Sequence, residues 1–348
     1  MPKIRVALVG CGNVALSSHL PSLIRLKDMV SVVAVSDTDL KRAESASKKF
    51  GIRSFYRSWE EMIVREEPDL VHICTPPDSH AQVSVGALER GCHVMVEKPM
   101  ATTLKECDEM IGAASKSGRM LCVAHNQRFH PCFLRARKMI AGGELGEVLD
   151  VRITHQLRKS VYLDPEHWVH RIGGGFFLEN FPHPIYLAIS LLGRVDLLSA
   201  EACRLNDHLA IPHDTFRVAL QGGNARCMIL VSFGGGSWNY TVEAIATSGA
   251  VDVDMYNSIL ITRRLPTLKV VDKNLSLVSQ WGQLTSQSFC TALRPSSKRW
   301  LQTHRALIKQ FVDAIIGGGR TPVPPEEGRE TVRICSEIAK KFVPAHAF

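Results

Sequence analysis

The stretch Val94–Pro99 reads Val-Met-Val-Glu-Lys-Pro, so a carboxylate and an amine directly follow three apolar residues. Three such residues are typical of the end of a buried strand. The charged pair then lies at the carboxyl edge of a sheet, where open α/β sheets bind their ligands. Pro99 restricts Lys98 to extended backbone angles and allows a cis Lys98–Pro99 bond. Taken alone, the stretch is also compatible with a surface Glu-Lys pair in a loop.

A glycine-rich turn follows the first predicted strand, Ile4–Val9. Residues 10–15 read G-x-G-x-x-A before a helical pattern. Gly10 allows a tight turn, Gly12 lets the backbone approach a pyrophosphate, and Ala15 lets the helix pack close to the strand. The pattern predicts a dinucleotide site, with the pyrophosphate at the helix N-terminus.

An acidic residue, Asp37, ends the second predicted strand, Val30–Ser36. At this edge a carboxylate hydrogen-bonds the adenosine ribose and repels a 2′-phosphate, which favours NAD over NADP. Lys41 and Arg42 follow closely and could reach a 2′-phosphate, so NADP stays open. Asp37 could also serve as the N-cap of a helix at Leu40–Phe50.

Strands and helices continue to alternate as far as residue 124, the pattern of a doubly wound parallel sheet. The further strands are expected at Asp69–Cys74, Cys92–Val96 and Met120–Ala124. The spacings Ser79-x-x-Gln82 and Thr103-x-x-Glu106 predict capping boxes for two of the helices. Gly91 and Gly118 are expected to end them.

The second half of the chain has the alternation of sheet strands and hairpins. Expected strands are Val148–His155, Phe216–Leu220, Cys227–Phe233 and Thr241–Thr247, and expected helices are 132–145, His304–Ile316 and Pro324–Phe342. Residues 265–300 show no clear pattern, and we expect there a variable excursion that could act as a lid.

The order GxGxxA, acidic end of strand two, T-P-P…H, E-K-P and N-x-R-F-x-P resembles the Gfo/Idh/MocA family of NAD(P)-dependent oxidoreductases. The resemblance implies an α/β protein: an N-terminal Rossmann domain (1–124) and a C-terminal domain (125–348) for substrate binding and oligomerisation. The second domain would contain a large open, mostly antiparallel sheet, with nicotinamide and substrate meeting between the domains.

The resemblance also implies residue roles. The residues implied in cofactor binding are Gly10, Gly12, Asn13, Val14, Asp37, Thr75, Pro76, His80, Glu97, Lys98, Asn126 and Arg128. Residues 173–183 are similar to the family's G-G-G…D-x-G-x-H signature, so Lys98, His183 and Glu179 are the implied catalytic residues. Tyr162 and Trp168 join Glu179 and His183 as implied substrate contacts.

Two residues depart from that signature. Glu179 replaces the usual Asp and reaches one methylene further, so its role is open. Phe181 replaces the usual Gly, which removes backbone freedom, and we expect it to add bulk near the pocket.

The chemistry agrees with these assignments. Hydride transfer between an alcohol and nicotinamide requires removal of the hydroxyl proton, which a desolvated amine or an imidazole can carry near neutral pH. We expect an NAD(P)-dependent dehydrogenase or reductase acting on a sugar, cyclitol or nucleotide-sugar derivative. The alternatives are NAD⁺-dependent glycoside cleavage or sugar–sugar oxidoreduction within the same family, and a redox-silent nucleotide-binding regulator.

Composition and charge indicate which partners, metals and cellular location to expect. The 348 residues carry a net charge of +8, but without a long basic run, so a nucleic-acid partner is not expected. The ten cysteines include no CxxC pair, and no His/Asp/Glu cluster has metal spacing, so we expect reduced thiols and no metal. No signal peptide or membrane span is indicated, which predicts a cytoplasmic protein. An open sheet with one apolar face suggests a homodimer or homotetramer.

Overall fold

The computed structural model divides into two compact units. They are Met1–Phe129 with Ser297–Arg333, and His130–Ser296 with Ile334–Phe348. The structure describes residues 2–157, 175–206, 211–234, 238–264, 270–292 and 299–342. The break after Phe129 is near the expected boundary at residue 124, but the segment Ser297–Arg333 groups with the first unit, which the sequence did not indicate.

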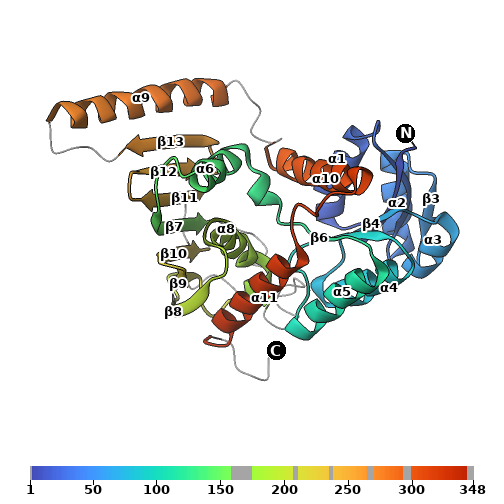
Figure 1. Ribbon diagram of the computed structural model, residues 1–348. Coiled ribbons are helices and arrows are strands. Elements are labelled where there is room, and N and C mark those ends of the chain that lie inside the picture. The colour runs from blue at the N-terminus through green and yellow to red at the C-terminus, as the bar shows by residue number, and fades with distance from the viewer. Residues whose placement is uncertain are drawn as a thin grey trace. The chain divides into compact units, whose positions relative to one another are not determined.

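The first unit contains a six-stranded sheet in the order β3-β2-β1-β4-β5-β6, and every neighbouring pair is parallel (Figure 1). The strands are β1 (Ile4–Val9), β2 (Val30–Ser36), β3 (Ser54–Tyr56), β4 (Leu70–Ile73), β5 (His93–Val96) and β6 (Leu121–Val123). All carboxyl ends therefore share one edge, and the strand order reverses between β1 and β4. The expected doubly wound sheet is confirmed, with its ligand-binding crevice predicted at this reversal.

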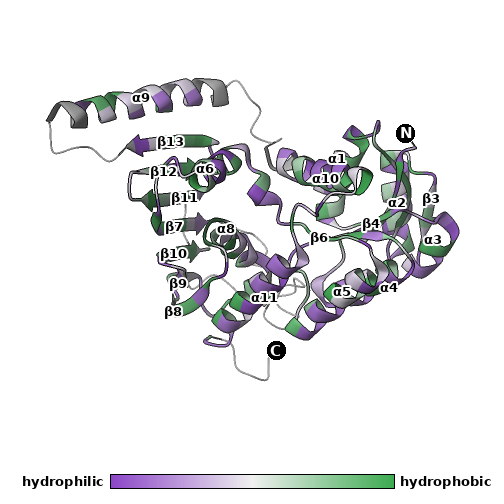
Figure 2. Cartoon of the chain, in the orientation of Figure 1, coloured by the Kyte–Doolittle hydropathy of each residue, from purple (hydrophilic) through white to green (hydrophobic). Residues whose placement is uncertain are grey.

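The first unit also contains helices and short helical turns. They are η1 (Ala15–His19, a π-helical turn), α1 (Leu20–Arg25), α2 (Leu40–Phe50), α3 (Trp59–Glu66), η2 (Pro77–Ser79), α4 (His80–Glu89), α5 (Leu104–Ser117), η3 (Asn126–Phe129) and α10 (Arg299–Gly317). The capping box of Thr103 and Glu106 forms at the start of α5, and Gly118 ends this helix in a left-handed conformation. Hydrophobic and hydrophilic residues share α5, as expected of a helix with one buried face (Figure 2).

The second predicted capping box is wrong. Ser79 precedes α4, but its backbone is helical and its side chain makes no cap hydrogen bond. The Oγ of Ser79 donates instead to Thr75 and to the Pro76 carbonyl, because the 3₁₀ turn η2 already continues into α4. Spacing alone could not show that turn.

The second unit contains a seven-stranded mixed sheet in the order β13-β12-β11-β7-β10-β9-β8. The strands are β7 (Val148–Gln156), β8 (Asp196–Cys203), β9 (Thr215–Gly222), β10 (Ala225–Ser232), β11 (Asn239–Ala246), β12 (Gly249–Asp254) and β13 (Ile259–Arg264). The pair β7–β10 is parallel and the other neighbouring pairs are antiparallel. The prediction of a mostly antiparallel sheet is confirmed.

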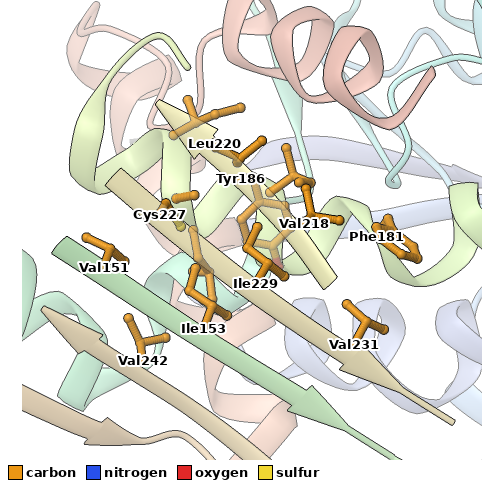
Figure 3. Close-up of a cluster of buried hydrophobic side chains, with 14 of the residues drawn as sticks. Val151, Ile153, Phe181, Tyr186, Val218, Leu220, Cys227, Ile229, Val231 and Val242 are labelled. Atoms are coloured by element: carbon orange, nitrogen blue, oxygen red, sulfur yellow. The ribbon is translucent and has the colours of Figure 1, made fainter. Parts of the chain in front are cut away.

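One face of this sheet forms an apolar core. The remaining helices are α6 (Pro131–Ala141), α7 (Gly175–Asn180), α8 (Pro182–Leu192), α9 (Val270–Ala292) and α11 (Pro325–Ala339), and the division between the units falls within α11. Alternate residues such as Val151, Ile153 and Ile229 point from the strands toward Tyr186 of α8 (Figure 3). Each of these side chains is buried.

The opposite face carries charged side chains among its residues. Arg152 of β7 contacts Glu243 of β11 at 3.3 Å, and Arg263 of β13 contacts Glu243 at 2.5 Å and Asp252 at 2.8 Å. These side chains form a line of ion pairs across four strands. The polar residues at alternate positions of β7 and β11 already indicated in the sequence that this face is polar.

Helix α9 lies within the stretch 265–300, where the sequence indicated no structure. Gln283 and Gln287 are one turn apart on α9, and their amides pair with the backbone of the edge strand β13. Gln283 accepts from the Thr262 N–H at 2.8 Å and donates to the Thr262 carbonyl at 3.1 Å; Gln287 does the same at Leu260, at 2.8 and 2.7 Å. The two side chains therefore occupy backbone groups that an edge strand would otherwise expose.

Two expectations about the whole chain can be compared with the described residues. None of the described helices is long and apolar enough to cross a membrane. Nine of the ten cysteines are described as free thiols, and most of these nine are buried.

Candidate active site

The glycine turn after β1 has the geometry that a dinucleotide requires. Gly10 adopts a φ of +89°, and a Cβ there would lie 2.7–2.8 Å from the backbone of Cys74 and Thr75, so only glycine fits. A Cβ on Gly12 would meet no atom within 4 Å, so the turn leaves open space beside its backbone. Asn13 and Val14 then lead into the helix. These residues fit a pyrophosphate cradled by backbone N–H groups.

Asp37 supports this turn from the end of β2. One carboxylate oxygen accepts the Cys11 backbone N–H at 2.8 Å, and the other accepts the Asp39 N–H at 2.9 Å. The expectation that Asp37 caps α2 is wrong, because Asp39 is the N-cap and accepts from Lys41. Asp37 is therefore held beside the glycine turn, with further lone pairs for ribose hydroxyl groups.

His80 joins two loops at the same edge of the sheet. Its ring nitrogens each lie 2.9 Å from a carbonyl oxygen, one of Thr75 and one of Pro99. Burial lowers the pKa of His80, although the two carbonyls oppose this shift. Thr75-Pro76 and Lys98-Pro99 thus share a buried support, and the Lys98–Pro99 bond is cis, as the sequence allowed.

Glu97 is buried at the carboxyl end of β5. Its Oε1 lies 2.8 Å from Nε2 of His19 and 3.6 Å from Nε2 of His304, while Oε2 accepts the Lys98 backbone N–H at 3.1 Å. Burial alone would raise the pKa of the Glu97 carboxyl. The two imidazoles outweigh that effect and hold the pKa well below its usual range. Glu97 is therefore an ionised carboxylate in the interior, next to the partly buried Lys98.

Asn126 and Arg128 are both buried on η3, after β6. Asn126 donates to Oγ1 of Thr303 at 3.0 Å and contacts Nδ1 of His304 at 3.3 Å. Arg128 forms an ion pair with Glu327 at the start of α11. Both residues thus have partners in the segment Ser297–Arg333.

Five partners of these site residues were not singled out from the sequence: His19, His72, Thr303, His304 and Glu327. No local pattern marks them, because His304 and Glu327 lie about two hundred residues from the groups they contact. His19 lies in the π-helical turn η1, a feature often found at functional sites.

Glu97 and the two histidines that face it could also bind a metal ion. The donor atoms of His19, Glu97 and His304 all lie within 4.8 Å of one another. Sequence spacing predicted no metal, since these residues come from three separate parts of the chain. The hydrogen bond of His19 to Glu97 and the close contact of His304 with the same oxygen account for this geometry without an ion.

In the second unit, His183 lies near the start of α8. Its Nδ1 hydrogen-bonds the hydroxyl of the buried Tyr186 at 2.8 Å, and its ring meets His155 edge-on. Glu179 is partly buried on α7. Tyr162 and Trp168 lie outside the described residues, as do Gly173 and Gly174.

Phe181 is part of the apolar core of the second unit. Its ring is fully buried and packs edge-on against Phe216, in contact with Phe177. Its φ of −63° is helical, so the position does not require glycine. This departure from the signature therefore adds to the core of the second unit.

Two family models match the chain. The model described as "Oxidoreductase family, NAD-binding Rossmann fold" matches residues 4–125, and the "GFO/IDH/MocA C-terminal domain" matches residues 133–252. The first range contains the glycine turn, Asp37 and Glu97-Lys98. The second contains Glu179 and His183.

Individual proteins are also similar. An uncharacterized oxidoreductase of Rhizobium meliloti, ORF334, is 32% identical over 344 residues, 98% of this chain and 97% of that protein. D-glucoside 3-dehydrogenase of Escherichia coli is 35% identical over 196 residues, which are 55% of this chain and 54% of that enzyme. The WlbA dehydrogenase of Bordetella pertussis, solved with NADH and UDP-GlcNAcA, shares the fold with a TM-score of 0.78 at 20% identity, covering 98% of this chain and 96% of its own.

Proposed function

This chain belongs to the Gfo/Idh/MocA family of oxidoreductases, and on that premise we propose that it transfers hydride between a nicotinamide cofactor and a carbohydrate-like substrate. The reacting group would be a secondary hydroxyl or keto group of a sugar, cyclitol or nucleotide sugar. One observation carries the proposal: the glycine turn, Asp37 and Glu97-Lys98 lie at the same carboxyl edge of one parallel sheet.

The cofactor in this proposal is NAD in preference to NADP. Asp37 is held beside the glycine turn by two backbone N–H groups, where its charge would accept ribose hydroxyl groups and repel a 2′-phosphate. Arg42, one of the two nearby cations that could favour NADP, lies 3.5 Å from Asp39. That ion pair reduces its availability for a phosphate.

Two groups are proposed to handle the substrate proton. The nicotinamide, when bound, supplies the hydride acceptor or donor. Lys98 would hold the reacting oxygen through its amine, and His183 would take or return the hydroxyl proton. The bond from Nδ1 of His183 to Tyr186 fixes the orientation of the imidazole ring. Glu179 retains a carboxylate that would orient the substrate.

The substrate class rests on the relatives. One similar protein is a D-glucoside 3-dehydrogenase, and a solved structure of the same fold contains UDP-GlcNAcA. Both names describe sugars or sugar derivatives. A carbohydrate or nucleotide sugar is therefore the first class to screen.

Titration with NADH and NADPH, followed by nicotinamide fluorescence, tests the cofactor assignment. Asp37→Ala should weaken NADH binding by about 10-fold and reduce the preference over NADPH, because hydrogen bonds to a charged group are lost. Asp39→Ala is the matched control, since it removes the same charge two residues away and should leave NADH binding within about twofold. Absence of NADH binding by the wild type, with no cofactor co-purifying, would reject the function.

We also propose that the protein forms a homo-oligomer. Leu275, Val278 and Trp281 project from α9 with most of their surface exposed. Exposed apolar side chains grouped on one helix are typical of an interface. Light scattering of wild type and Trp281→Glu would test this, and a monomeric wild type would reject it.

A further inference from the structure

A group of buried polar side chains in the first unit contacts Glu97, either directly or through one another. Its members are His19, His72, His304, Thr303 and Asn126. Only Asn126 has a role implied by sequence, and the hydride-transfer chemistry proposed above uses none of the histidines. The group is nevertheless connected by short polar contacts to the loop that carries Lys98.

The carboxylate of Glu97 divides its two oxygens between two sets of partners. Oε1 faces the Nε2 atoms of His19 at 2.8 Å and of His304 at 3.6 Å. Oε2 accepts the backbone N–H of Lys98 at 3.1 Å. The imidazoles therefore fix the carboxylate, and the carboxylate fixes the backbone from which the Lys98 amine extends.

The outer partners determine which nitrogen of each imidazole carries hydrogen. An ionised carboxylate only accepts hydrogen bonds, so His19, at 2.8 Å, must present Nε2–H to Glu97. The Nε2 of His304 faces the same oxygen at 3.6 Å, where a hydrogen on Nε2 is favoured over a lone pair. A neutral ring of that form has a bare Nδ1. In His304 this atom accepts from the Asn126 amide at 3.3 Å, and in His19 it lies 2.9 Å from Nδ1 of His72, which can donate to it. Both outer partners thus favour the tautomer that Glu97 needs.

We propose that His19 and His304 are positioning residues, held as Nε2–H tautomers by His72 and Asn126, which lock Glu97 and thereby orient Lys98. This role rests on the proposed function, since it concerns the same lysine. It also assigns a role to the segment Ser297–Arg333, because His304 on α10 contacts Glu97, which follows β5 in the first hundred residues. Asn126 acts here through His304.

The first test measures the reactivity of Lys98 without substrate or cofactor. Wild type and variants are labelled with trace acetic anhydride, and mass spectrometry gives the ratio of acetylation at Lys98 to that at the exposed Lys105. His19→Leu and His304→Leu should each raise this ratio, because Glu97 would no longer hold the loop that carries Lys98. An increase of about fivefold is expected, the factor that corresponds to loss of one ordinary hydrogen bond. His19→Gln and His304→Gln retain an N–H donor and should return the ratio to within about twofold of wild type.

A matched control separates positioning from general loosening. His93→Leu removes an imidazole at the other end of β5, where Nδ1 accepts from the Met120 N–H. It should leave the Lys98 ratio unchanged. The proposal is overturned if the Leu variants of His19 and His304 do not change the ratio, if the Gln variants behave like the Leu variants, or if His93→Leu has an equal effect.

A measurement on the wild type keeps the proposal falsifiable if the Leu variants do not fold. With ¹⁵N-labelled histidine, nitrogen NMR should show His19 and His304 as neutral Nε2–H tautomers, assigned with the Gln variants. Nδ1–H in either ring would overturn the proposal. NADH titration of the same samples is read separately: failure of wild type to bind rejects the proposed function, while labelling and NMR still decide the positioning role.

Discussion

The two sheets of this protein place their functional groups in different ways. In the parallel sheet of the first unit, every strand ends at the same edge, so the loops after β1, β2, β4, β5 and β6 all lie at that edge. In the mixed sheet of the second unit, neighbouring strands mostly end at opposite edges. Its distinctive groups therefore lie on a face, as the ion pairs of Arg263, or along an edge, as Gln283 and Gln287.

The comparison also shows what each arrangement requires for support. The edge site depends on a buried carboxylate, Glu97, which must be satisfied by further buried polar groups. The second sheet has a line of partly exposed ion pairs on one face and an apolar core on the other. We therefore expect substitutions around Glu97 to affect chemistry and pH dependence, and those in the strands of the second sheet to affect packing and association.

The largest expected effect is at the reacting edge. Lys98→Ala should lower kcat by about 10²–10⁴-fold on the substrate found by screening, because the group that supports the proton transfer is removed. NADH affinity should stay within about threefold, since the glycine turn and Asp37 are intact. Lys105→Ala, an exposed lysine on α5, is the control. Retention of most activity by Lys98→Ala would remove this lysine from the chemistry.

Glycine substitutions test the turn itself. Gly10→Ala should destabilise the protein by about 3 kcal/mol, because a positive φ and a clash with the backbone of Cys74 and Thr75 act together. Gly51→Ala has a φ of +66° but no atom within 4 Å of the added Cβ, so it should cost only about 1 kcal/mol. Urea unfolding measures both. Equal losses would contradict the close approach of β1 and β4.

Acidification should destabilise the first unit. Burial lowers the pKa of His19, His72, His80 and His125 below the value of the unfolded chain. The unfolded state therefore binds more protons as pH falls through about 6.5, and the free energy of unfolding decreases by up to about 1.4 kcal/mol per pH unit for each histidine. Urea midpoints at pH 7.5 and 5.5 measure this. A pH-independent midpoint across that range would show that these rings are not buried and neutral.

The smallest effect is expected at the edge of the second sheet. Gln287→Ala removes two hydrogen bonds to Leu260 and should cost about 1 kcal/mol, since each bond contributes little net stability and water can replace it at an edge. Gln280→Ala, seven residues earlier on α9, bonds only Ser276 and is the comparison. Circular-dichroism melts of both variants would show the difference. No difference between them would mean that the glutamine pairing does not hold α9 on β13.

Sequence patterns predicted the parallel sheet well because its signals are local. Strand Ile4–Val9, the turn at Gly10, Asp37 and the capping box at Thr103 each depend on residues within a few positions. The Ser79 prediction was wrong where a 3₁₀ turn changed the helix start without changing the spacing. The order of the family's motifs then predicted that the cofactor binds at the carboxyl edge of this sheet.

The residues that contact Glu97 and Arg128 could not be predicted from the sequence, because only the folded chain brings them together. His304 meets Glu97 only after α10 packs against η1 and η3, and Glu327 meets Arg128 in the same way. Helix α9 was missed because its polar and apolar residues do not follow one buried face, and its glutamines serve a strand edge. Single-sequence periodicity carries no information on such distant pairs.

Hydrogen exchange with and without NADH tests the central claim most directly, that the carboxyl edge of the parallel sheet binds the cofactor. We predict protection at residues 10–16, 37–42, 74–80 and 96–100, where the loops follow β1, β2, β4 and β5. Segments 66–69, 90–92 and 118–120, at the opposite edge of the same strands, should not change. Protection confined to that opposite edge, or none at saturating NADH, would contradict the assignment.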